Sequence, residues 1–127
     1  MDSNEPSVTM TSVIDDLKLL PLEIFNSGRE MLLNIKKSEE INLIIKSIEQ
    51  KTMSEILSET NVDGKKKFPN AEMRDQELFL RLKNNNDYLV HKQNHDELKD
   101  KIAEEKLNLE FKNNLFKAAL MLSWMVE

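Results

Sequence analysis

The chain has 127 residues, which is enough for one domain and too few for a second large one. Two glycines and three prolines are too few for the turns of a β-sandwich or an α/β fold, and the abundance of helix formers predicts a few long helices. The net charge of −5 argues against non-specific nucleic-acid binding as the main activity, and the absence of cysteine excludes disulfides, thiolate metal sites and cysteine nucleophiles.

Residues 1–12 are polar and show no apolar pattern, so we expect a disordered tail there. Asp2 and Glu5 stand where a signal peptide would be basic, and secretion is therefore not expected. The longest apolar run, residues 118–126, is shorter than the roughly twenty residues that a membrane span needs. We expect a soluble, cytoplasmic protein without a membrane partner.

A long helix is predicted from about residue 22 to residue 57. Pro21 follows the short apolar segment VIDDLKLL, and proline suits the first turn of a helix. Mostly apolar side chains then recur at the spacing of one helical face. These residues are Ile24, Met31, Ile35, Ile41, Ile45, Ile48, Thr52 and Ile56.

The segment SETNVDGKKKFP ends this helix, and a short helix is predicted for residues 70–83. The turn formers of residues 61–64 interrupt the helical pattern, and Pro69 disfavours the helical conformation at Phe68. Asn70 then stands at the N-cap position of the short helix. We expect Phe68 to fix the corner between the helices.

A last helix is predicted for residues 87–125, with Asp87 as its N-cap after the polar break NNND. One stripe of this helix repeats in a heptad-like pattern, although Glu105 and Lys112 interrupt it. The stripe consists of Tyr88, His91, His95, Leu98, Ile102, Leu109, Phe116 and Ala119.

The first and last helices are of similar length, and neither can bury its stripe alone. Because a corner separates them, and because antiparallel pairing brings their apolar-rich halves together, we expect them to run in opposite directions. The predicted fold class is all-α: a long antiparallel, coiled-coil-like helical hairpin with a short extra helix at the corner. Residues 13–127 would form a single domain.

A second apolar face of the last helix stays outside this pairing, and large exposed apolar faces usually mark an interface. A second copy of the chain is the favoured cover, which predicts a homo-oligomer. A fold-back of the segment VIDDLKLL is the alternative. The candidate oligomer interface consists of Leu107, Phe111, Leu115, Leu122 and Met125.

Basic and aromatic residues concentrate at the corner. Lysine and arginine can bind phosphate and phenylalanine can stack on a base, so the corner is a candidate contact site for single-stranded DNA or a partner protein. The simpler interpretation is a solvated lysine loop, in which Arg74 reaches Glu59 or the last carbonyls of the first helix. The candidate contact residues are Lys65, Lys66, Lys67, Phe68, Asn70 and Arg74.

The stretch KKKFPNAEMRDQELFLRLKNNNDYL, residues 65–89, resembles small early-region proteins of tailed phages and prophages. Shared features are the basic run, the aromatic-Pro-Asn corner, the following arginine, RL, a polar break and a tyrosine, with Asn70 and Arg74 matching directly. The resemblance extends over most of residues 20–125. It implies an unknown partner protein in replication, recombination or host-defence interference, in the cytoplasm of a host cell, and implies no activity.

Asp87, His91 and His95 recur every four residues along one edge of the last helix, and a histidine pair at this spacing can bind zinc. Lys92 stands where a metalloprotease motif requires glutamate, and a third convergent ligand is not visible. Two histidines in the polar part of the helix pair are the simpler interpretation, so no metal or cofactor is predicted.

The sequence lacks a phosphate loop, a dinucleotide fingerprint and a nucleophile elbow. The favoured hypothesis is a non-enzymatic helical interaction protein that associates with itself and binds a partner protein. The alternatives are an accessory factor that contacts single-stranded DNA through residues 65–74, and, third, a metal-dependent enzyme using His91 and His95.

Overall fold

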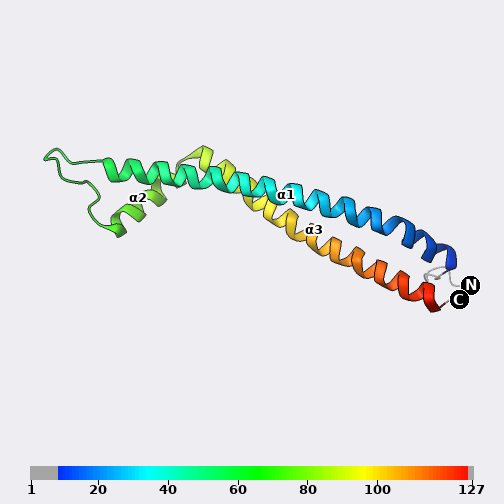
Figure 1. Ribbon diagram of the computed structural model, residues 1–127. Helices are drawn as coiled ribbons and strands as arrows, with labels where there is room; N and C mark the ends of the chain where they lie inside the picture. The colour runs from blue at the N-terminus through cyan, green and yellow to red at the C-terminus, as the bar shows by residue number, and fades with distance from the viewer. Residues whose placement is uncertain (1–8, 126–127) are drawn as a thin grey trace, which may run out of the picture. The chain divides into compact units, whose positions relative to one another are not determined.

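The computed structural model describes residues 9–125, which form three α-helices: α1 (Met10–Ser58), α2 (Ala71–Lys83) and α3 (Asn86–Met125) (Figure 1). The chain divides into two compact units. Unit 1 combines Met1–Asn34 with Lys101–Glu127, and unit 2 is Ile35–Asp100.

Each unit holds a segment of α1 packed against a segment of α3, and unit 2 also holds α2. This arrangement confirms the predicted all-α helical hairpin with a short extra helix. The single domain expected for residues 13–127 stays a prediction. Within the described part of the chain, no helix is long and apolar enough to cross a membrane.

α1 begins at Met10, whereas the sequence predicted a start near residue 22. The Thr9 Oγ1 accepts a hydrogen bond from the backbone N–H of Ser12 at 3.2 Å, and the Thr9 N–H donates to the Ser12 Oγ at 3.3 Å. This reciprocal pair caps the helix. Residues 10–12 are therefore helical and not part of a disordered tail, while residues 1–8 of that predicted tail lie outside the described residues.

Pro21 lies inside α1 and not in its first turn. An interior proline removes one backbone hydrogen bond and crowds the carbonyl of the preceding turn, which costs about 3 kcal/mol. Tertiary packing outweighs this cost, because Val13 and Leu20 are only 2% and 5% exposed. Residues 13–20 therefore extend α1, and the alternative in which they fold back was wrong.

In unit 1 the two helices meet along a heptad seam, with contact positions alternately three and four residues apart, as in a coiled coil. Every residue of this seam is buried or half-buried. The seam consists of Val13, Leu17, Leu20, Ile24, Ser27, Met31 and Asn34 on α1, and of Ile102, Glu105, Leu109, Lys112, Phe116 and Ala119 on α3.

The core of unit 2 is mostly apolar. Ile45 is 4% exposed, Ile56 is 1% exposed, and Leu82 of α2 is also buried. Thr52 is also buried, and its hydroxyl donates to the Ile48 carbonyl at 2.7 Å. The polar atom of this buried threonine is thus satisfied within its own helix.

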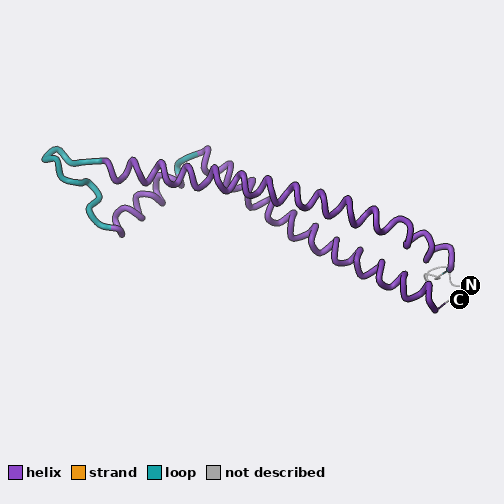
Figure 2. The backbone as a smooth tube through the Cα atoms, viewed as in Figure 1, coloured by secondary structure: helices purple, strands orange, loops and turns teal. Residues whose placement is uncertain are grey.

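A loop connects α1 and α2 (Figure 2). Asn61 accepts a hydrogen bond from the Gly64 N–H at 2.9 Å and donates its own N–H to the Lys65 carbonyl, and Gly64 has a φ of +80°. The predicted start of α2 is confirmed, because the Asn70 side chain accepts a hydrogen bond from the Met73 N–H at 2.9 Å.

α3 starts one residue earlier than the sequence predicted, at Asn86. The Asn85 Oδ1 accepts a hydrogen bond from the Tyr88 N–H at 3.1 Å, so Asn85 is the cap and the prediction of Asp87 in this role was wrong. Asp87 lies instead in the first turn, where a carboxylate favours the positive end of the helix dipole.

Candidate interaction surfaces

Two polar pairs cross the seam of unit 1. The Asn34 amide donates to the Glu105 Oε1 at 2.6 Å, and the Lys112 ammonium donates to the Ser27 hydroxyl at 2.9 Å. Sequence reasoning placed Glu105 and Lys112 as interruptions of the stripe, whereas both lie within it and each has a partner on α1.

The two pairs fix how α1 and α3 are aligned in unit 1. Ser27 precedes Asn34 by one heptad, and Glu105 precedes Lys112 by one heptad, so both pairs form only in one antiparallel register. A shift of either helix would leave charged groups without partners in a half-buried seam, which is more costly than losing apolar contacts. The polar residues at heptad positions of the sequence were the signal for this fixed register.

The outer side of α3 in unit 1 is apolar. Leu107 is 67% exposed, Phe111 61%, Leu115 39% and Met125 77%, while Leu122 is half-buried. These are the five residues that the sequence predicted for an oligomer interface. Four of them are exposed, and the interface itself stays a prediction.

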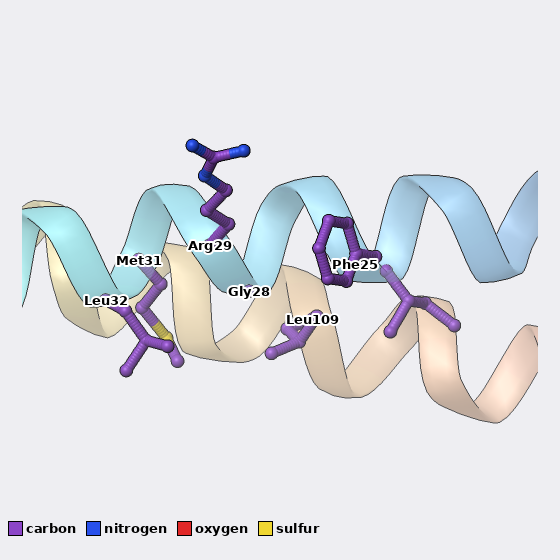
Figure 3. A pocket seen from close by; sticks show the side chains of 7 residues that line it. Phe25, Gly28, Arg29, Met31, Leu32 and Leu109 are labelled. Carbon is purple, nitrogen blue, oxygen red and sulfur yellow. The ribbon is translucent and has the colours of Figure 1, made fainter.

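α1 carries a second exposed apolar surface in unit 1. Phe25 and Leu32 are each 64% exposed, and they flank Gly28 (Figure 3). A shallow groove forms here, and its lining is almost entirely apolar. It is lined by Ile24, Phe25, Gly28, Arg29, Met31, Leu32 and, from α3, Leu109. This surface was not predicted from the sequence, although a glycine between two large apolar residues on one helical face was a readable signal.

At the corner in unit 2, Arg81 binds Glu59. Its Nη2 lies 2.8 Å from both carboxylate oxygens of Glu59, and its Nε donates to the Glu77 Oε1 at 2.8 Å. These hydrogen bonds, first from Glu77 and then from Glu59, raise the pKa of Arg81 above its ordinary value. The predicted contact of Arg74 with Glu59 or with the last carbonyls of α1 was wrong: Arg81 binds Glu59, and Arg74 donates to the carbonyls of Phe68 and Pro69.

Arg74 instead stabilises its own loop. Its Nη1 donates to the carbonyls of Phe68 and Pro69 at 3.4 and 3.3 Å. The Phe68 ring is half-buried, with the Lys67 ammonium 5.5 Å and the Arg81 guanidinium 5.8 Å from its centre. Cations on the ring stabilise it where it is, and they compete with a stacking base.

The six predicted contact residues therefore divide into three groups. Phe68, Asn70 and Arg74 form the loop and the helix cap, whereas Lys65 and Lys66 are exposed and make no ion pair within the described residues. Lys67 is intermediate, with its ammonium 3.9 Å from Glu59.

The histidines of α3 lie in unit 2. His91 Nδ1 is 2.7 Å from the Asp87 carbonyl and 3.3 Å from its carboxylate. His95 Nδ1 is buried and has no hydrogen-bond partner among the described residues. In residues 9–125, no group of three or more potential ligands converges to hold a metal ion.

Comparison of the chain with protein-family models, with curated proteins and with solved structures gave no match. The resemblance to small phage and prophage proteins therefore stays a prediction.

Proposed function

We propose that this chain is a non-enzymatic helical interaction protein, which associates with itself through unit 1 and binds a partner protein. The observation that supports this proposal most directly is the exposure of large apolar side chains on both helices of unit 1. Besides the residues on the outer side of α3, they include Leu22, Phe25, Leu32, Leu33 and Trp124, with exposed fractions of 60%, 64%, 64%, 60% and 79%.

Two helices in contact can each bury one stripe, and side chains elsewhere on them need a further helix as cover. Burying one leucine or phenylalanine stabilises a complex by roughly 1.5 to 3 kcal/mol. Association itself costs roughly 4 to 15 kcal/mol. The five side chains of the predicted interface on α3 are therefore comparable with this cost, and burial of the α1 surface as well would provide the surplus that a stable complex needs.

In the phage setting that the resemblance implies, the partner is a replication, recombination or host-defence protein of the host cytoplasm. A helical surface rich in leucine, phenylalanine and methionine suits an amphipathic helix of such a partner, because those side chains adapt to the opposing surface.

Light scattering on the purified protein at tens of micromolar tests self-association. We expect a mass of two chains or more, which falls as the protein is diluted; a mass of one chain throughout contradicts the proposal. A pull-down from infected host cells with the wild-type chain tests partner binding, with a variant carrying lysines at Leu107 and Met125 as the control for the α3 surface.

Contact with single-stranded DNA through the corner is the second candidate, and the exposed ammonium groups of Lys65 and Lys66 favour it. Each phosphate contact on a single strand contributes about −0.7 to the slope of log affinity against log salt. Removing both lysines should therefore flatten that slope by about 1.4. If a gel shift at low salt detects no complex, this candidate is wrong.

A further inference from the structure

Four residues of α1 form a hole on the outer side of unit 1. Phe25, Gly28, Arg29 and Leu32 stand at positions i, i+3, i+4 and i+7, and all four line the same groove (Figure 3). In coiled coils, four residues at this spacing surround the side chain that a facing helix inserts. We refer to these four residues as the α1 hole.

Gly28 keeps the floor of the α1 hole open. Apart from its chain neighbours and the nearby backbone of α1 itself, a Cβ added at Gly28 would meet no described atom within 4 Å, so the glycine is not required by close packing between α1 and α3. Glycine inside a helix is unfavourable compared with alanine, and its presence here is explained when another chain inserts a side chain at this position.

α3 carries a second heptad stripe that is separate from the seam. Its residues are spaced alternately three and four apart, and every one of them is exposed. We refer to this set as the α3 stripe: Glu104, Leu107, Phe111, Asn114, Ala118, Met121 and Met125. Phe111 is its largest side chain, and it is 61% exposed.

Charge also matches between the two surfaces. Arg29 is the charged residue of the groove lining, at a corner of the α1 hole. Glu104 lies one heptad before Phe111, Glu110 directly precedes it, and both carboxylates are exposed. A helix that inserts Phe111 into the hole thus brings carboxylates to the side of Arg29, which favours this pairing over one between two α1 holes with like charges.

We propose that the α3 stripe of one copy packs into the α1 hole of a second copy, with Phe111 as the inserted side chain. This inference rests on the proposed function and specifies its self-association. Each copy then offers one surface and accepts another, so the contact joins two different surfaces, and a chain that uses both can bind two neighbours.

Two variants separate the surfaces. Leu32→Lys places a charge in the α1 hole, and Phe111→Lys removes the inserted side chain and opposes Arg29. Both positions are more than half exposed, so each variant retains the seam. Leu43→Lys is the matched control, because Leu43 is 67% exposed on α1 and belongs to neither surface. Circular dichroism verifies that all four proteins are equally helical.

Sedimentation velocity then measures association. We expect the wild type and the control to associate alike. The dissociation constant for self-association of Leu32→Lys and of Phe111→Lys should each be at least about tenfold higher than that of the wild type. In an equimolar mixture, the intact α3 stripe of Leu32→Lys meets the intact α1 hole of Phe111→Lys. The mixture should therefore form a species of two chains while each variant alone remains a single chain.

The other outcomes overturn the inference. If the mixture contains only single chains, the pairing is not between these two surfaces. If either variant associates as the wild type does, its surface is not used, although self-association through another face survives. If the wild type itself is a single chain at all concentrations, the proposed function fails as well.

Discussion

In unit 2, α1 packs against both α2 and α3, and the contacts bury Ile45, Ile56 and Leu82 almost fully. In unit 1, α1 packs against α3 alone, polar pairs lie within the seam, and aromatic side chains such as Phe25 and Phe111 remain exposed. The two units do not differ in whether apolar side chains are buried, because Val13 and Leu20 of unit 1 are as buried as Ile45 of unit 2, and Leu43 and Phe79 of unit 2 are each 67% exposed. They differ in the contact between α1 and α3: among the described residues, side-chain hydrogen bonds join these two helices in unit 1, while unit 2 adds a third helix to the packing.

Ile56→Ala should be the most destabilising of the changes considered for either unit. Its side chain is 1% exposed, and removing three methyl or methylene groups from such a site costs about 3 kcal/mol through lost burial and the cavity that remains. Urea unfolding measures this loss as a lower midpoint at an unchanged slope. Leu57→Ala is the control, because Leu57 is 41% exposed, and it should cost less than about 1 kcal/mol. Equal losses from the two changes would contradict the assignment of Ile56 to the core.

Asn34→Leu should cause the next largest loss of stability. It leaves Glu105 in the seam without the amide that binds its Oε1, while the Glu105 Oε2 is already buried without a partner among the described residues. Leaving a carboxylate unpaired in this way costs about 1 to 2 kcal/mol.

The double variant Asn34→Leu with Glu105→Leu tests whether this polar pair stabilises unit 1 or only sets its register. Replacing a buried polar pair by apolar side chains is often neutral or stabilising, so we expect the double variant to recover the loss. A thermodynamic cycle over the four proteins measures the coupling. If the double variant is less stable than Asn34→Leu alone, the pair stabilises unit 1 and does not only set its register.

Arg81→Met should cost about 1 kcal/mol, because the side chains of Arg81, Glu59 and Glu77 are each about a quarter to a third exposed and water screens their charges. Lys67→Met is the control, since the Lys67 ammonium is 3.9 Å from Glu59 and more than half exposed, and it should leave the unfolding midpoint unchanged. A larger loss from Lys67→Met than from Arg81→Met would contradict the assignment of Arg81 as the residue that links α1 to α2.

The pH dependence of the Arg81 contribution follows from its raised pKa. A cation whose pKa is higher in the folded protein stabilises the fold fully below the unfolded pKa, and this stabilisation disappears as the pH rises through the folded value. Arginine is protonated between pH 7 and pH 9 in the unfolded chain as well as in the folded protein, so Arg81 should contribute no change in stability between about pH 7 and pH 9. If the difference in free energy of unfolding between Arg81→Met and the wild type becomes smaller from pH 7 to pH 9, this expectation is wrong.

The helices and their pairing could be predicted from the sequence because each stripe repeats at the period of the structure it forms. The start of α1 could not, since Pro21 is a strong local signal for a helix start and only tertiary burial of Val13 and Leu20 outweighs it. The corner shows the same limit. Arg74 and Arg81 both lie on α2, and the direction in which α2 faces α1 decides which of them reaches Glu59.

The interaction surfaces of unit 1 were predicted only for α3. In a bundle of several helices, an apolar residue next to the stripe is buried and widens the core. In a pair of helices, the same residue stays exposed and is a candidate interface residue. Phe25 and Leu32 fit both interpretations in the sequence, and their exposure in unit 1 shows only that the helix pair does not bury them.

The smallest expected effects come from the two glycines, one in each unit. Gly28→Ala should stabilise unit 1 by about 0.5 to 1 kcal/mol, because alanine is the better helix former and its Cβ would meet no described atom within 4 Å. Gly64→Ala should destabilise unit 2 by about 1 kcal/mol, because a φ of +80° is strained for any residue with a Cβ.

The same chemical change is thus expected to have opposite signs at the two positions. Thermal unfolding of dilute protein measures both, since dilution removes any contribution from association at the α1 hole. A stabilising Gly64→Ala would mean that the turn adopts another conformation in solution. A destabilising Gly28→Ala would mean that an atom of the same chain occupies the space beside Gly28, and in that case the α1 hole would be closed to a second copy.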